Sequence, residues 1–267
     1  MGGTMEMHTD CGGQIPVREV IGKLDRLLEK DRAEEAERHL YEWLDEAGRL
    51  GDWQGEITLL NELMGFHRSS GKRREGLEAA RKGIRLVRSR GMEKTVTAGT
   101  TFLNAATTMK AFGETEEAMP FYEEAEKLYN RFLEEGDYRF AGLYNNLALA
   151  WTDLGQYERA FLYYDRALRL LGQLPGNAME SAVTWVNLAC LWEKKEKDPD
   201  RREERIEECL ARAMEYLDDP EAERDGYYAF TCRKCAPTMG HFGRFRAERE
   251  LRERADLIYR GLRNERT

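Results

Sequence analysis

Apolar and polar positions follow a helical period over almost the whole chain. Apolar side chains recur every three or four residues, which places them on one face of a helix. Gly or Pro stands at many of the breaks between these segments, as expected at helix ends. No segment reads as a strand. The pattern predicts an all-α protein with helices over about 16–28, 32–50, 53–69, 73–90, 95–112, 114–133, 140–154, 156–171, 179–195 and 202–217, and two more within 226–267.

The pattern is clearest between Phe140 and Leu171, where two amphipathic helices are joined at Gly155. Small residues stand where two helices must approach closely, and large ones fill the space around them. The order aromatic, Leu, small, aromatic, Gly, Tyr, small, aromatic, small resembles the tetratricopeptide repeat (TPR). The residues that carry this resemblance are Tyr144, Leu147, Ala148, Trp151, Gly155, Tyr157, Ala160, Tyr164 and Ala167.

The same pattern returns every 42 residues, from Gly155 back to Gly113 and Gly71. This period exceeds the roughly 34 residues of common TPRs. The runs 143–148 and 116–122 resemble the longer repeats of kinesin light chains, and the chain as a whole resembles bacterial TPR proteins. The resemblance implies a right-handed α-solenoid of about six TPR hairpins, or about twelve antiparallel helices. We expect one solenoid domain over 16–263, a flexible tail over 1–15 and a short tail over 264–267.

Composition limits the classes of function that the protein can have. Charged residues make up 34% of the chain and the formal net charge is −8, which a solenoid tolerates because each hairpin buries only the sides that face its neighbours. Net acidity argues against nonspecific nucleic-acid binding. No apolar run reaches the roughly 18 residues of a membrane span, and 1–14 lacks the features of a secretory signal. The odd number of cysteines, five, indicates reduced thiols in a cytoplasmic protein.

An asparagine recurs on the first helix of successive hairpins. Asn104, Asn146 and Asn187 are spaced by 42 and 41 residues, Asn61 precedes them, and Asn145 stands beside the central one. In kinesin light chains and in the peptide-sensing regulators of Gram-positive bacteria, groove asparagines hold the backbone of an extended peptide, and the resemblance implies the same here. The alternative is that each amide bonds a neighbouring helix and specifies stacking.

Cations and hydroxyls share the predicted concave face. Arg68 and Lys110 occupy equivalent places one repeat apart, and Thr107, Thr152 and Arg233 lie on the same face. Two cations could bind an acidic side chain or a terminal carboxylate, as in the carboxylate clamp of chaperone-binding TPRs, of which only parts are present. The alternative is that these are solvated surface charges.

Cys232 and Cys235 form a C-x-x-C motif, with His241 six residues further on. A structural zinc site needs four ligands and no second such motif exists, so we expect buried structural thiols and no metal or cofactor. Pro237 predicts a kink or an early helix end nearby. Phosphate-binding loops and the H-E-x-x-H and G-x-S-x-G motifs are absent, which argues against an enzyme.

The sequence therefore predicts a non-enzymatic module that binds an extended peptide or a partner helix in the concave groove of the solenoid. Two alternatives remain open: a peptide-sensing regulatory subunit that acts on a separate effector, and a self-associating structural scaffold. Since TPR surfaces vary over a constant core, neither the partner, the pathway nor the oligomeric state follows from the fold.

Overall fold

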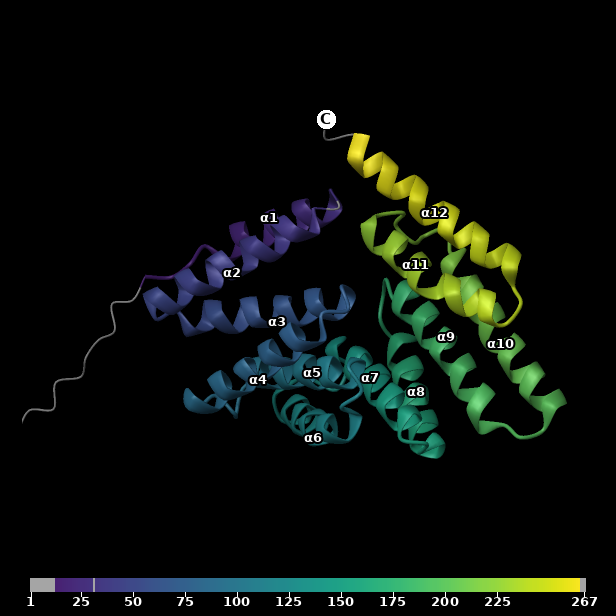
Figure 1. Cartoon of the computed structure of the whole chain (residues 1–267). Coiled ribbons are helices and arrows are strands. Elements are labelled where there is room, and N and C mark those ends of the chain that lie inside the picture. The colour runs from purple at the N-terminus through teal and green to yellow at the C-terminus, as the bar shows by residue number, and fades with distance from the viewer. Residues whose placement is uncertain (1–12, 31, 265–267) are drawn as a thin grey trace, which may run out of the picture. The chain divides into compact units, whose positions relative to one another are not determined.

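The computed structural model describes residues 13–30 and 32–264, and these residues form twelve α-helices and no strand (Figure 1). The predicted all-α class is confirmed. Within the described ranges, none of the helices is both long and apolar enough to cross a bilayer. The helices are α1 (Val17–Glu29), α2 (Ala33–Leu50), α3 (Trp53–Ser69), α4 (Arg73–Ser89), α5 (Val96–Ala111), α6 (Thr115–Phe132), α7 (Arg139–Asp153), α8 (Tyr157–Leu171), α9 (Ala178–Lys195), α10 (Pro199–Leu217), α11 (Gly226–His241) and α12 (Phe245–Asn264).

The chain divides into two compact units, Met1–Met92 and Glu93–Thr267. In the first unit, α1 contacts α2, α2 contacts α3, and α3 contacts α4. The prediction of a single domain over 16–263 stays a prediction.

The predicted tails fall mostly outside the described residues, which begin at 13 and end at 264. The tail predicted for 1–15 is wrong at its last residue. Ile15 is 5% exposed, and its N–H donates to Oδ2 of Asp52 at 3.0 Å. The same carboxylate accepts from the N–H of Gly55 at the start of α3. At the other end, α12 includes Asn264.

The second unit contains four hairpins, and the two helices of each lie side by side (Figure 1). The pairs are α5 with α6, α7 with α8, α9 with α10, and α11 with α12. The odd-numbered helices also contact one another in chain order, α5 with α7, α7 with α9, and α9 with α11. They form a continuous row, on which the predicted concave-face residues of this unit lie.

The 42-residue period is visible in the core of the second unit. Tyr122 and Tyr164 are both fully buried, one repeat apart, and each stands four residues after a fully buried alanine. Gly113 and Gly155 have φ of 86° and 70°, values that a residue with a Cβ adopts at a cost. The N–H groups that follow them bond back to the ends of α5 and α7, as in a Schellman motif.

Two helix boundaries differ from the sequence prediction by more than one residue. α10 begins at Pro199 rather than near residue 202, because Asp198 caps it by accepting from the N–H of Arg201 at 3.0 Å and Pro suits the first helical position. α11 continues through Pro237 and ends at His241, so the early end predicted near Pro237 is wrong. Pro237 is exposed, and its missing N–H costs the helix no buried hydrogen bond.

His67 is a fully buried titratable group in the first unit. Its Nε2 is 3.0 Å from the hydroxyl of Tyr41, and its Nδ1 is 3.8 Å from a carboxylate oxygen of Glu37. Burial lowers the pKa of His67 below its ordinary 6.5, and Lys72 lowers it further, while Glu37 and Glu75 oppose the shift. The folded first unit therefore favours the neutral imidazole.

Acidification is expected to destabilise the first unit through His67. The unfolded chain takes up this proton near pH 6.5, whereas the folded chain resists it to lower pH. The stability is therefore fully present above that value and falls as the pH drops from about 7 towards 5. Urea unfolding followed by circular dichroism at pH 7.5 and 5.5 measures the loss. The variant His67→Gln should show a smaller loss over the same interval, and an equal loss would contradict this role for His67.

Candidate functional site

Three adjoining hollows lie around α9 and its neighbours α7 and α11, all within the second unit. Tyr227, at the start of α11, lines all three. The first and second hollows also share Gly176 and Asn177, and the first and third share Leu171 and Glu180. We refer to the three together as the α9 groove.

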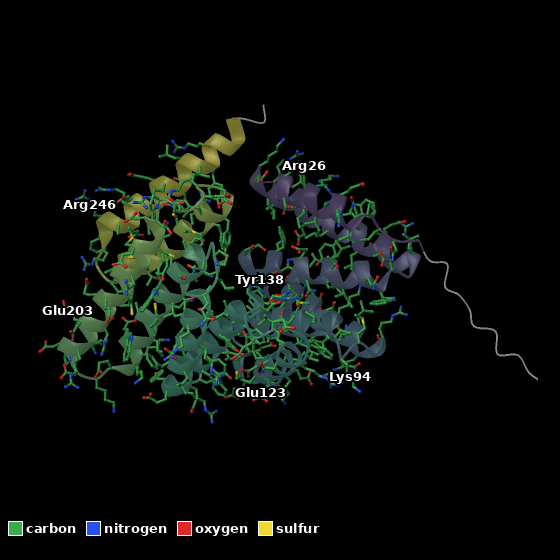
Figure 2. The ribbon with its side chains drawn as sticks, turned by 180° about the vertical axis from the view of Figure 1, so that it is seen from behind. Arg26, Lys94, Glu123, Tyr138, Glu203 and Arg246 are labelled. Atoms are coloured by element: carbon green, nitrogen blue, oxygen red, sulfur yellow. The ribbon has the colours of Figure 1, made fainter. Side chains whose placement is uncertain are left out.

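The first hollow, here the tyrosine hollow, has a volume of about 580 Å³ and mostly apolar walls. Tyr138 is 72% exposed and is labelled in Figure 2, at the start of α7. Arg139 is held by both carboxylate oxygens of Asp137, at 2.8 and 2.6 Å, and these hydrogen bonds lower the pKa of Asp137. The lining residues are Tyr138, Arg139, Ala141, Gly142, Leu171, Leu174, Pro175, Gly176, Asn177, Glu180 and Tyr227.

Tyr227 and Phe230 form an exposed aromatic pair on α11. Their ring centroids are 6.4 Å apart, and the ring planes are nearly parallel, with an angle of 13° between them. The two residues are 48% and 51% exposed. The hydroxyl of Tyr227 donates to Oε1 of Glu180 on α9 at 2.9 Å. Burial, together with the charge and hydrogen bond of Glu180, raises the pKa of Tyr227. The phenol therefore stays protonated, and the bond to Glu180 fixes its ring beside the tyrosine hollow.

The third hollow, here the amide hollow, has a volume of about 180 Å³ and includes Asn145, Asn146, Thr231 and Lys234 in its lining. Asn187 Nδ2 on α9 donates to Asn145 Oδ1 on α7 at 3.1 Å, which leaves the two N–H donors of Asn145. Asn146 Nδ2 donates one N–H to the carbonyl of Gly142 at 2.8 Å, which leaves its second N–H and its Oδ1. Neighbouring side chains thus offer three donors and an acceptor.

The hydroxyl of Thr231 has no hydrogen-bond partner among the described residues, although the residue is only 1% exposed and its Oγ1 is buried. Other helical threonines satisfy this group by donating to the carbonyl four residues earlier, as Thr184 and Thr108 do at 2.8 Å. An unpaired buried hydroxyl costs about 1–3 kcal/mol. Thr231 lines the amide hollow, and a ligand there could supply the missing partner once the side chain rotates its Oγ1, which is buried in this conformation, towards the hollow.

The second hollow, here the acidic hollow, has a volume of about 560 Å³ and lies where α9 begins and α10 connects to α11. Four carboxylate residues line it: Asp219, Glu221, Glu223 and Asp225. Asp225 caps α11 by accepting from the N–H of Tyr228, and Asp219 accepts from the N–H of Glu221. Among the described residues, no cation pairs with the carboxylate of Glu221 or Glu223.

The asparagine row is divided between neighbouring positions. The hydrogen bond between α7 and α9 joins Asn187 to Asn145, which is 42 residues earlier, and not to Asn146. This bond is of the kind that the stacking interpretation requires. Asn104 lies half-buried on α5, while Asn61 and Arg68 lie half-buried on α3 in the first unit, and all three have interactions within the chain.

The predicted cationic side chains of the second unit form ion pairs with carboxylates of the same unit. Lys110 Nζ is 3.0 Å from Asp153 Oδ2, and Arg233 Nη2 is 2.8 Å from Asp256 Oδ1. The guanidinium of Arg233 also lies 4.4 Å from the ring centre of Tyr259. These pairs weaken the case for an acidic ligand at Lys110 or Arg233.

The two predicted threonines bond their own helices. Thr107 donates to the carbonyl of Leu103, and Thr152 to that of Ala148, both at 2.8 Å. Neither lines the α9 groove. Their hydroxyls therefore serve the backbone of α5 and α7.

The C-x-x-C motif is buried in α11. Cys232 and Cys235 are both 0% exposed, and burial raises the pKa of both thiols, that of Cys235 to about 12. In the part of the chain that the structure describes, no group of His, Cys, Asp and Glu is placed to hold a metal ion. A protonated, buried thiol is a poor nucleophile and ligand, so both cysteines act as core residues.

Sequence reasoning missed Tyr138, Tyr227, Phe230, Thr231 and Glu180. Tyr227 and Phe230 are three residues apart at the start of α11, on the same face of the helix, and neither fits a buried TPR position. That mismatch was the available signal. The sequence holds no signal for the unpaired hydroxyl of Thr231, because the surroundings of this group depend on how α9 and α11 pack.

Comparison with known proteins places the fold. No family model matches the sequence, and no curated protein matches it. A structure of kinesin light chain TPR-like repeats from Podosopora anserina is 14% identical, covers 76% of this chain and 94% of its own, and has a TM-score of 0.50. The apo quorum sensor NprR from B. thuringiensis is 15% identical over 90% of this chain, with a TM-score of 0.56. NprR in complex with its cognate peptide NprX gives 0.57 at 15% identity, again over 90% of this chain.

This chain spans 63% of the apo NprR chain and 66% of the peptide-bound one. At these identities the likeness concerns the fold alone. The period, the buried alanines and tyrosines of the hairpins and these structural neighbours agree: the chain has the fold of a TPR-like repeat protein, an all-α solenoid of about six hairpins.

Proposed function

We propose that the protein is a non-enzymatic interaction module that binds an extended peptide segment in the α9 groove. The observation that carries the proposal is the set of unused polar groups in the amide hollow. Asn145 has two donors, and Asn146 one donor and one acceptor, without partners among the described residues, and Thr231 has an unpaired buried hydroxyl. An extended peptide presents carbonyl acceptors and N–H donors along its length, so it can satisfy these groups without its side chains being read.

The fold and the walls of the groove support the same proposal. Packed helices present the hollows on a preformed surface, so little ordering is needed on binding. The exposed aromatic rings of Tyr138 and Tyr227 add apolar area beside the amides. Peptide binding by NprR is a property of NprR alone. For this chain, the proposal rests on its own side chains.

Asn146→Ala is expected to weaken peptide binding about twofold to tenfold, the range for one neutral hydrogen bond of about 0.5–1.5 kcal/mol. The probe is a peptide enriched from a random nonapeptide phage library panned on the immobilised protein. Its Kd is measured by fluorescence polarisation for the wild type and the variant.

The matched control is Asn130→Ala, which removes the same amide from an exposed position on α6 outside the groove. Circular dichroism establishes that both variants fold. The proposal fails if panning enriches no peptide, or if Asn146→Ala binds the enriched peptide as tightly as Asn130→Ala does.

A further inference from the structure

We infer that the peptide carries an aromatic or large aliphatic side chain close to a Lys or Arg, the apolar side chain in the tyrosine hollow and the basic one in the acidic hollow. This rests on the proposed function and names the class of its ligand. The two hollows adjoin at Gly176, Asn177 and Tyr227, so neighbouring side chains of one peptide can enter both.

The tyrosine hollow suits an apolar side chain. Leu171, Leu174 and Pro175 line it together with Tyr138 and Tyr227. Its volume of about 580 Å³ exceeds that of any single side chain, so a ring fits without displacing the walls. Aromatic pairs are stabilised beyond the contribution of the area they bury, which favours Phe, Tyr or Trp over a smaller residue.

The acidic hollow suits a cation. Glu221 and Glu223 are exposed, and neither carboxylate has a cation partner among the described residues. Asp219 and Asp225 stand beside them, and their carboxylates accept hydrogen bonds from backbone N–H groups. A Lys or Arg entering here meets several carboxylates at once, and the chain's net charge of −8 attracts a basic peptide from a distance.

The cationic side chains near the groove do not offset the negative charge of the acidic hollow. The positive charge of Arg139 is offset by its ion pair with Asp137. Arg224 donates to the carbonyls of Leu217 and Asp219 and lies over the ring of Tyr228. Lys234 lines the amide hollow, which shares only Tyr227 with the acidic hollow. The unused amides and the unpaired hydroxyl of Thr231 belong to the amide hollow, and they point to a ligand of the α9 groove independently of the carboxylates.

The test uses three pools of fluorescein-labelled nonapeptides and the full chain. Each peptide has a central Phe, a second fixed residue two or three positions away on either side, and Ala, Ser, Gly, Asn or Thr elsewhere. The second residue is Lys, Gln or Glu, one per pool. The Lys pool is expected to bind about tenfold more tightly than the Glu pool at low salt, an advantage that shrinks as salt screens the charges.

The double variant Glu221→Gln, Glu223→Gln should reduce this Lys-over-Glu preference about threefold to tenfold, since each exposed ion pair changes affinity by about fivefold at most. The matched control is Glu203→Gln, Glu204→Gln, which removes the same charge from exposed positions on α10 outside the groove; Glu203 is labelled in Figure 2. A further variant, Tyr227→Ala, reports whether the pools bind in the groove.

Equal binding of all pools, weakened by Tyr227→Ala, would overturn the inference and leave the proposed function standing. A preference reduced equally by the control pair would also overturn it, because the effect would then belong to net charge. Absence of binding by every pool would overturn the inference, and the proposed function fails with it only if panning of the random library also enriches no peptide.

Discussion

Tyr164→Ala is expected to lower the free energy of unfolding of the second unit by about 3–5 kcal/mol, the range for deleting a buried aromatic side chain. Tyr164 on α8 is 0% exposed and belongs to the core that continues into α9, α10 and α11. It stands between Ala160 and Ala167 in sequence, both fully buried. Alanine cannot fill the space, and the small neighbours cannot close it.

Urea unfolding monitored by circular dichroism measures the loss by linear extrapolation. Leu162→Ala is the matched control, because Leu162 lies on the same helix and is 57% exposed, so its truncation should change stability by less than about 1 kcal/mol. In a repeat array the damage should spread mainly to adjacent hairpins, which hydrogen exchange would detect first in α7 to α10. A loss as small as that of Leu162→Ala would contradict the packing described for Tyr164.

The equivalence of Tyr164 and Tyr122 could be read from the sequence, and so could most of the hairpin architecture. A position where two helices approach within contact distance accepts only small side chains, and a position that fills the gap between hairpins needs a large one. These requirements repeat at a fixed spacing, as at Ala118 and Ala160. Helix existence and order were therefore predictable.

The groove was less predictable, because its properties depend on neighbours that are distant in sequence. Lys110 and Arg233 were correctly placed on first helices, yet their partners Asp153 and Asp256 lie on other helices or in other hairpins. The asparagine spacing suggested one row, whereas the bond from Asn187 goes to Asn145. A rotation of one residue about a helix axis separates these outcomes, and sequence spacing does not resolve it.

Thr231→Val is expected to weaken binding of the enriched nonapeptide about tenfold or more while leaving the protein as stable as before or more stable. Valine keeps the shape of threonine and replaces the hydroxyl by a methyl group. Without ligand, the buried hydroxyl has no partner among the described residues, so its removal relieves a desolvation cost. With the peptide bound, the variant forfeits a buried hydrogen bond of about 1–3 kcal/mol.

The opposite signs of these two effects distinguish a binding residue from a structural one. If the threonine only supports the fold, its substitution should lower both stability and affinity. If its hydroxyl stays unsatisfied until a ligand binds, the substitution should lower the affinity and leave the stability unchanged or higher. Melting temperature and the Kd of the enriched peptide are therefore measured on the same samples.

Thr108→Val is the matched control for Thr231→Val. Thr108 is 0% exposed on α5, and its hydroxyl is satisfied by the carbonyl of Asn104 at 2.8 Å. Its substitution should cost about 1 kcal/mol or less in stability and leave the Kd unchanged. If Thr231→Val lowers the melting temperature and leaves the Kd unchanged, its hydroxyl has a partner within the fold, and the amide hollow loses the observation that most directly points to a ligand.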